Sequence, residues 1–324
     1  MTTFNQITFP IKDHLDNFEP FFREAVVSNI PMLDKILHYI IRRKGKQMRP
    51  IMIFLSAGLC GNISEKSYHG ALTIELIHSA TLVHDDVVDD SFQRRGAFSI
   101  NALWRNKISV LVGDFILGKG LTWCIEHKEY KFLELISETV SAMSEGEIIQ
   151  IDKARKLDIT REVYFDIIEK KTASLLACSA AIGAASTTDD DDTINELKQF
   201  GKDLGIAFQI KDDVLDYQNS NIIGKPTGND LRERKVTLPL IYALEKSSTK
   251  EQKAILRKLR KKKKNSKDIS ELTEFVITNG GLQHANEQMN IFTERAHARL
   301  MKFPKTEYRD ALEHYIEFVT TRNK

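Results

Sequence analysis

Two clusters of aspartates are the residues of this 324-residue chain best suited to chemistry. Each has the spacing Asp-Asp-x-x-Asp after an apolar run, and the members are Asp85, Asp86, Asp89, Asp212, Asp213 and Asp216. On a helix, the first and last aspartates of a cluster share one face, about 6 Å apart, where like charges destabilise the helix. A solvated helix end would explain one such cluster, whereas the repeated spacing indicates a bound counter-charge.

These carboxylates suit a hard divalent cation. Mg2+ takes oxygen ligands in octahedral geometry and usually completes its shell with water and substrate phosphates. Two rows of carboxylates that face each other across a helical bundle would hold several Mg2+ ions with a diphosphate between them. The sequence therefore predicts a magnesium-diphosphate site.

Basic residues stand close to the acidic clusters in the sequence. Arginine binds phosphate through paired hydrogen bonds and lysine acts as a point charge. No single one is informative, but together their placement fits a diphosphate: Lys46 and Arg49 in a loop with Gly45 and Pro50, Arg94 and Arg95 after the first cluster, Lys171 beside Thr172, and Lys225 and Lys235 around the loop after the second cluster.

The segments that must position these residues have a helical pattern. Apolar residues recur at spacings of three and four, with no alternating strand pattern, over residues 51–59, 68–83, 108–124, 132–151, 161–185 and 194–217. Several of these segments have little polar face, which is typical of helices inside a bundle. We predict an all-α fold in which residues 1–324 form a single domain, because nothing along the chain resembles a linker.

Composition and charge exclude several classes of protein. Glycine and proline are scarce, at 16 and 7 residues, which argues against a collagenous or low-complexity chain. The net charge of +2 gives no global field for nucleic acid. The strongest local charge run is Lys258 to Lys264, which is either a solvated loop or a weak attraction to an anionic membrane surface.

The cysteines and the N-terminal residues favour a cytoplasmic protein. Cys60, Cys124 and Cys178 lie far apart in apolar or small-residue settings, which indicates neither a metal site nor a disulfide framework. The first 20 residues lack the basic start and apolar core of a signal peptide. No uncharged run approaches the roughly 18–20 residues of a membrane span.

Taken together and in this order, the motifs resemble those of the trans-isoprenyl diphosphate synthases, the polyprenyl synthetase family. Gln209 before the second cluster and Lys235-x-Thr237-x-Pro239 after it also match. The resemblance implies an isoprenoid-synthase-type helical bundle around a deep central cavity, usually a homodimer. Its reaction would join an allylic diphosphate, such as farnesyl or geranylgeranyl diphosphate, to isopentenyl diphosphate.

The resemblance also implies roles for single residues. Asp85 and Asp89, supported by Asp86, would bind Mg2+ on one side of the allylic diphosphate, and Asp212, supported by Asp213 and Asp216, on the other, with three ions per site. The same diphosphate would contact Arg94, Lys171, Lys225 and Lys235. Isopentenyl diphosphate would contact Lys46, Arg49, His78 and Arg95. Thr172 and Gln209 would present oxygens toward the developing carbocation, and with Lys171 and Arg94 they form the predicted catalytic set. His78 could also be a general base or a core histidine.

The residues before the first cluster bear on product length. Ala80 and Thr81 lie one helical turn, about 6 Å, below Asp85, which is close to one five-carbon unit. Small residues there leave room for a growing tail, and Ile77 on the next turn is moderate in size. We predict a product between geranylgeranyl and octaprenyl diphosphate, with the long end favoured. Phe115 and Trp123 either form the floor of the tunnel or are ordinary core residues.

Two other functions fit parts of the pattern. A class I terpene cyclase shares an aspartate-rich helix, but its second metal motif differs and it has no use for the loop from Gly45 to Pro50. A non-catalytic regulatory subunit of a heteromeric prenyl synthase would be expected to lack the aspartate clusters, and both are intact here.

Overall fold

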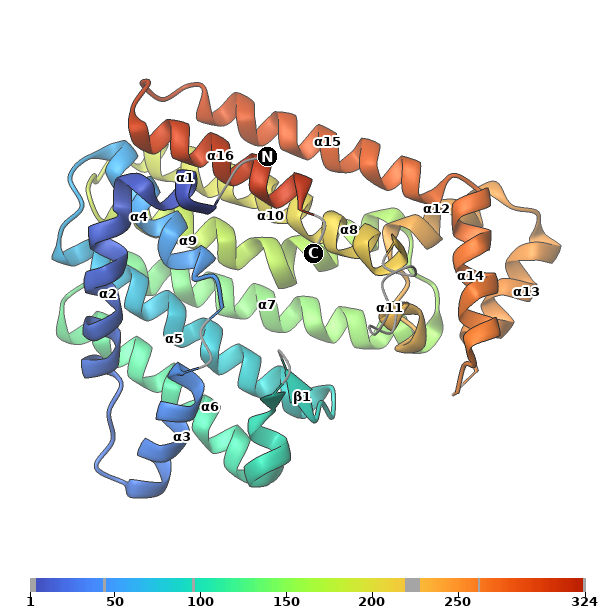
Figure 1. The fold of residues 1–324 in the computed structure, drawn as a ribbon, viewed down its shortest axis with the longest axis horizontal. Helices are drawn as coiled ribbons and strands as arrows, with labels where there is room; N and C mark the ends of the chain where they lie inside the picture. The colour runs from blue at the N-terminus through green and yellow to red at the C-terminus, as the bar shows by residue number, and fades with distance from the viewer. Residues whose placement is uncertain (1–3, 43–44, 95–96, 219–227, 262, 323–324) are drawn as a thin grey trace.

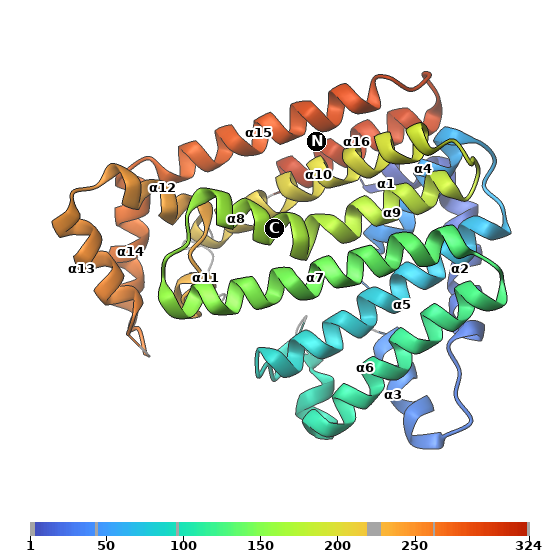
Figure 2. The same ribbon diagram turned by 180° about the vertical axis from the view of Figure 1, so that it is seen from behind.

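The computed structural model describes residues 4–42, 45–94, 97–218, 228–261 and 263–322. Its elements, in chain order, are α1 (Phe4–Thr8), η1 (Phe9–Ile11), α2 (Lys12–Ala25), α3 (Pro31–Ile41), α4 (Met48–Cys60), α5 (Glu65–Val88), β1 (Gln93–Arg94), β2 (Ala97–Phe98), α6 (Ile100–Glu126), α7 (Tyr130–Lys156), α8 (Arg161–Ile168), η2 (Glu169–Ala173), α9 (Ser174–Ala185), α10 (Asp191–Gln218), α11 (Asn229–Arg232), α12 (Leu238–Lys246), α13 (Thr249–Leu259), α14 (Ser266–Thr278), α15 (Gly281–Leu300) and α16 (Glu307–Thr321). Long helices pack side by side into a bundle (Figures 1 and 2).

The predicted all-α fold is confirmed, with one small addition. Each predicted helical segment lies within helices of the structure, and α5 continues through Asp85 and Asp86 to end at Val88. The addition is a two-residue antiparallel ladder between β1 and β2. A pairing this short has no alternating pattern that the sequence could reveal.

The centre of the bundle is built from helices that are apolar on every face. Almost all side chains of α4 and α9 are buried. A Cβ on Gly183 of α9 would lie 2.5 Å from the carbonyl oxygen of Ile53 in α4, so these helices meet backbone to backbone. Gly183, which has no side chain, allows this close approach.

Helix α10 joins two groups of buried side chains. Leu197, Phe200 and Leu204 belong to the larger core, with α4, α5 and α9. Ile210 and Val214, further along the helix, belong to a second core with α12, α14 and α15. The second aspartate cluster follows at the end of this shared helix.

Helix α6 is covered on one face only. Its inner face packs along α5, where a Cβ on Gly113 would clash with the ring of His84. Its outer face exposes Val110, Leu111 and Ile125. Within the described residues, α6 is also the one helix long and apolar enough to span a membrane, and a third of its most apolar stretch is buried. The sequence had not suggested such a segment, because charged residues interrupt this apolar run.

Candidate active site

Lys235 interacts electrostatically with carboxylates near both aspartate clusters. Burial lowers the pKa of its ammonium, but a 2.7 Å contact with Glu233 and further carboxylates outweigh burial, so the pKa is raised. Those carboxylates include Asp89 of the first cluster and Asp230, whose backbone N–H donates to Asp216 of the second. One ammonium thus interacts with carboxylates from both sides, and α5 and α10 end near β1 and α11, which brings the two clusters to the same region of the bundle (Figure 1).

The second cluster borders a cavity of about 220 Å3. It brings together five residues of the predicted site: Lys171, Thr172, Gln209, Asp213 and Lys235. Tyr164 and Asp230, which the sequence did not single out, line the same cavity.

Lys171 and Thr172 are carried by η2, a five-residue π-helix between α8 and α9. Such wide turns are frequent at functional sites. Glycines on both sides let neighbouring helices approach it closely. A Cβ on Gly146 of α7 would lie 3.0 Å from the backbone nitrogen of Lys171, and one on Gly205 of α10 would lie 2.6 Å from a backbone Cα of η2. Glu147, next to Gly146, forms an ion pair with Lys171.

A chain of hydrogen bonds connects η2 to the second cluster. Thr172 Oγ1 donates to Gln209 Oε1 at 2.8 Å, and Gln209 Nε2 donates to Asp213 Oδ1 at 2.8 Å. The hydroxyl of Tyr164 donates to Asp213 Oδ2 at 2.6 Å. Burial and the nearby charge of Asp230 raise the pKa of Asp213 well above its usual range. Both oxygens of Asp213 are occupied, so this buried carboxyl orients its neighbours.

Asp212 has a partner near the end of the chain. Arg322 Nη2 lies 2.6 Å from Asp212 Oδ1, and the guanidinium stacks 4.1 Å from the centre of the Phe208 ring. Burial raises the pKa of Asp212, although Arg322 opposes this shift. The cation supplied by the end of α16 thus lies beside the carboxylate that is predicted to hold metal.

Asp230 adds a carboxyl group to the second cluster. Burial and the charge of Asp216 raise its pKa to about 6, although Lys235 opposes the shift. The group of carboxylates at the end of α10 is therefore larger than the Asp-Asp-x-x-Asp spacing suggested.

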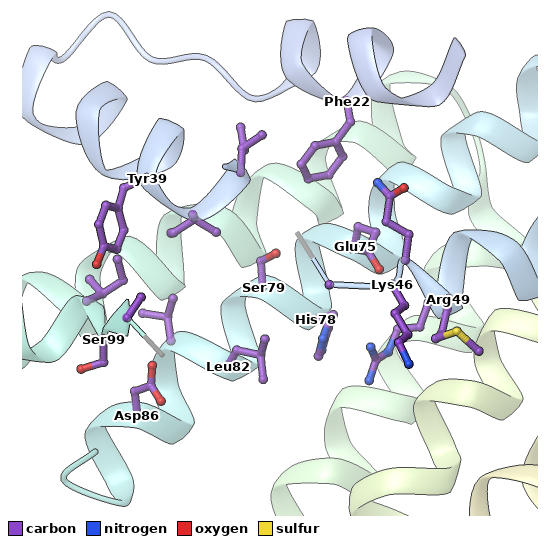
Figure 3. A pocket seen from close by; sticks show the side chains of 18 of the residues that line it. Phe22, Tyr39, Lys46, Arg49, Glu75, His78, Ser79, Leu82, Asp86 and Ser99 are labelled. Atoms are coloured by element: carbon purple, nitrogen blue, oxygen red, sulfur yellow. The ribbon is translucent and has the colours of Figure 1, made fainter. Parts of the chain in front are cut away.

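A second cavity, of about 320 Å3, lies among α2, α3, α4 and α5. Figure 3 shows Lys46, Arg49 and His78 together on one side of it and Asp86 on the other, with apolar side chains such as Leu82 between them. The structure thus groups three of the four residues that the resemblance assigns to isopentenyl diphosphate. Asp86 is nearly fully buried in this wall.

Helix α16 braces the loop that carries these cations. The hydroxyl of Tyr315 donates to the carbonyl of Met48 at 3.1 Å, and the ammonium of Lys46 lies 4.7 Å from the centre of the Phe318 ring. Gln47, between them, has a left-handed backbone with φ of 50°. Non-glycine residues adopt this conformation at a cost, so surrounding contacts must hold it. The same helix therefore contacts both halves of the candidate site.

Several residues of the predicted site line neither cavity or lie outside the residues that the structure describes. Ala80 and Ile77 are fully buried and Thr81 is half-buried, and neither cavity includes them in its lining. Ile77 packs toward α6, where a Cβ on Gly120 would lie 3.6 Å from its Cδ1 atom. The floor candidates Phe115 and Trp123 are partly buried against the main core. Arg95, Lys225 and the side chain of Arg94 lie outside the described residues.

The available metal donors are carboxylate oxygens. In the part of the chain that the structure describes, no three histidine, cysteine, aspartate or glutamate side chains form a group that could hold a metal ion by themselves. Mg2+ commonly takes one or two protein carboxylates and completes its shell with substrate phosphates. Asp85, Asp89 and Asp212 fit this chemistry, because cationic side chains nearby can bind the phosphates that would complete the shell.

Of the residues that the sequence analysis did not single out, one could have been inferred from local spacing and one could not. Tyr164 lies seven residues before Lys171, two helical turns along the same stretch, so the spacing could have suggested a shared face. Arg322 is 110 residues from Asp212, and no local pattern connects the two.

Comparisons with known proteins agree with this geometry. The family model described as polyprenyl synthetase matches residues 30–276. All-trans-nonaprenyl-diphosphate synthase (geranyl-diphosphate specific) of Rhodobacter capsulatus is 33% identical over 308 residues, which cover 94% of each chain. Octaprenyl diphosphate synthase of Escherichia coli is 34% identical over 290 residues, covering 89% of this chain and 90% of that protein. The crystal structure of a Caulobacter crescentus polyprenyl synthase complexed with calcium and isoprenyl diphosphate is 31% identical, with a TM-score of 0.91 and coverage of 100% and 99% of the two chains.

Proposed function

The chain belongs to the polyprenyl synthetase family and is a chain-elongating prenyltransferase, and we propose that its two cavities bind the two substrates of that reaction. Enzymes of this family join an allylic diphosphate to isopentenyl diphosphate. The observation that carries the assignment is that each cavity is lined by both cations and carboxylates: Lys46, Arg49 and Asp86 in one, and Lys171, Lys235 and Asp213 in the other.

The cavity beside the second cluster is assigned to the allylic diphosphate. Lys171 and Lys235 are its described cations, and Arg94 and Lys225 are proposed to join them. Each of the two described ammonium groups is held by a glutamate, Glu147 or Glu233, so both are positioned before substrate arrives. Preorganised charge of this kind stabilises the leaving diphosphate as its carbon–oxygen bond breaks.

The larger cavity is assigned to isopentenyl diphosphate. Lys46, Arg49 and His78 would hold its diphosphate, with Arg95 added by resemblance, while the apolar stretch around Leu82 suits its hydrocarbon part. Holding the double bond next to the allylic carbon replaces a bimolecular encounter by an intramolecular one.

We assign the metal to the carboxylates that remain accessible. Asp85, Asp89 and Asp212 would hold Mg2+, three ions per site, with Asp86, Asp213 and Asp216 in support. Bound Mg2+ would neutralise charge on the diphosphate.

Thr172 and Gln209 face the bond that breaks. Their mutual hydrogen bond fixes both side chains, and the oxygens that they turn toward the cavity would stabilise the positive charge on carbon. The final proton would pass to the released diphosphate.

Product length is proposed to lie between geranylgeranyl and octaprenyl, with the long end favoured. Ala80 and Thr81 place no bulky side chain one turn below the first cluster, and Ile77 is of moderate size. The two relatives described above have names that specify nonaprenyl and octaprenyl products.

We propose that the protein is a homodimer assembled through α6. Val110, Leu111 and Ile125 lie on one exposed stripe of that helix, and Leu111 is 56% exposed. The variant Leu111→Asp should produce a monomer by light scattering, whereas Ile277→Asp, at an equally exposed position on α14, should remain dimeric. An unchanged dimer in Leu111→Asp would place the interface elsewhere.

We further propose that residues 1–324 act as one domain in the cytoplasm. The path of α10 through both cores supports one folding unit. Free Cys60, Cys124 and Cys178 support a reducing compartment, and burial raises the pKa of the Cys60 thiol to about 12.

The test of the function uses the purified chain alone with labelled isopentenyl diphosphate, farnesyl diphosphate and Mg2+. We expect a lipid-soluble product that disappears with chelator. Asp212→Asn should lower kcat at least a hundredfold, whereas Asp192→Asn, an exposed aspartate on the same helix, should not. No turnover by the chain alone would instead favour a subunit that needs a catalytic partner.

A further inference from the structure

Residues 246–267 are far more basic than the rest of the protein. They contain eleven lysines and arginines and one acid, Glu251. The whole chain has a net charge of +2, so this segment carries +10 and the remainder carries −8. We call residues 246–267 the basic corner. It comprises α13 with its flanking residues and lies at the end of the molecule opposite α2 (Figures 1 and 2).

Some of these cations form ion pairs and hydrogen bonds within the protein. Lys258 pairs with Glu271 and Lys261 pairs with Asp268, and both acids are on α14. The ammonium of Lys264 is buried and donates to the carbonyl of Arg232 at 3.3 Å. Because Arg232 ends α11, which also carries Asp230, this contact attaches the basic corner to the wall of the active site.

The other cations form an outward face. Lys250, Lys253 and Arg257 are exposed and lie at spacings of three and four on one side of α13, while Ile255 and Leu259 are buried on the opposite side. In the described residues, none of these three cations forms an ion pair with an acid. The loop that follows adds exposed Arg260 and Lys263.

We propose that the basic corner is a docking surface for an anionic lipid bilayer. Clustered lysines and arginines are attracted to the negative surface potential of such a membrane. The proposal rests on the proposed long-chain product, because a hydrocarbon tail of that size partitions into a bilayer, where a subsequent transferase must take it up. The chemistry of the product thus favours a lipid surface over a nucleic acid or an acidic protein.

Vesicle sedimentation tests this surface separately from catalysis. The full chain is mixed with vesicles of phosphatidylcholine, or of phosphatidylcholine with about 30 mol % phosphatidylglycerol, at about 0.1 M and 0.5 M salt. We expect binding to the anionic vesicles only, and loss of that binding at high salt.

The key variant is Lys250→Gln/Lys253→Gln/Arg257→Gln, and the matched control removes three exposed lysines elsewhere, Lys12→Gln/Lys35→Gln/Lys305→Gln. The first should bind anionic vesicles roughly tenfold or more weakly, with unchanged turnover in detergent, whereas the control should bind within about twofold of the parent. Equal loss in both variants, no vesicle binding by the parent, or binding of duplex RNA in place of vesicles would overturn the proposal. A defect in the proposed function would instead appear as lost turnover in detergent.

Discussion

Arg322 Nη2 lies 2.6 Å from Asp212 Oδ1, although 110 residues separate them. The pair joins the end of α16 to the second aspartate cluster. The same helix also contacts the loop of Lys46 and Arg49, so α16 is in contact with both halves of the candidate site.

Replacing Arg322 should alter the metal requirement. Arg322→Gln removes a cation that competes for Asp212, so we expect the Mg2+ concentration at half-maximal activity to fall. Asp212 is 42% exposed, and solvent screening limits such a pair to about 1 kcal/mol, or fivefold. Magnesium titration of initial rates measures the effect. Lys302→Gln, which breaks an exposed pair with Glu196, is the control, and an unchanged or higher magnesium requirement in Arg322→Gln would contradict the competition.

Loss of the Tyr164 hydroxyl should destabilise the buried network. Tyr164→Phe leaves the fully buried Asp213 Oδ2 without its donor, so the free energy of unfolding should fall by about 1–3 kcal/mol. Asp213, the hydrogen-bond partner of Gln209, is then held less firmly, so kcat should fall while KM changes little. Urea denaturation checks the first effect. Tyr315→Phe, which removes a hydrogen bond that is only partly buried, should lose about 0.5–1.5 kcal/mol.

Asp230 should make stability depend on pH. Its pKa in the folded protein is about 6, above the usual 3.8, so the folded state holds a proton that the unfolded state has lost. Asp230 therefore makes its full contribution to the stability of the folded state below about pH 4, and this contribution is lost as the pH rises to about 6. Asp230→Asn should remove that loss and gain about 1–2 kcal/mol at pH 7 over the parent, allowing for its partial exposure. Thermal unfolding in chelator across pH measures it. Glu274→Gln, at an exposed site on α14, should show no such dependence, and a pH-independent difference for Asp230→Asn would disprove the assignment.

Enlarging Ala80 should shorten the product. Ala80→Phe places an aromatic ring one turn below Asp85, so chain growth should stop several units earlier, as thin-layer chromatography of the products would show. Ala80→Ser keeps the side chain small and should leave chain length as in the parent. Unchanged products from Ala80→Phe would eliminate this part of α5 as a determinant of length.

The close contact at Gly205 should not tolerate a side chain. Gly205→Ala puts a Cβ 2.6 Å from a backbone Cα of η2, and overpacking of this kind costs about 1–3 kcal/mol. Displacement of η2 should also misplace Lys171 and lower kcat. Gly120→Ala, where the new Cβ would meet neighbours at ordinary contact distance, is the control. Calorimetry and initial rates of both variants compare the two positions, and equal melting temperatures would refute the packing explanation.

The sequence by itself determined the helices and pointed to the candidate reacting groups. Periodicity of three and four is a local property, so it revealed α4 to α10, and the repeated aspartate spacing on α5 and α10 pointed to a shared charge before any contact was known. Lys171, Thr172 and Gln209 were assigned their roles by resemblance to the short motifs of the family, and neither periodicity nor spacing indicated those roles.

Only the tertiary structure decided how these groups are used. Asp213 looks like its neighbours in sequence, yet burial beside Tyr164 and Gln209 makes it an internal hydrogen-bond acceptor. Arg322 and Asp230 join the site through packing of α16 and α11, which depends on contacts between residues far apart in the chain. Desolvation and long-range pairing set the charge and orientation of a side chain, and neither is encoded in local spacing.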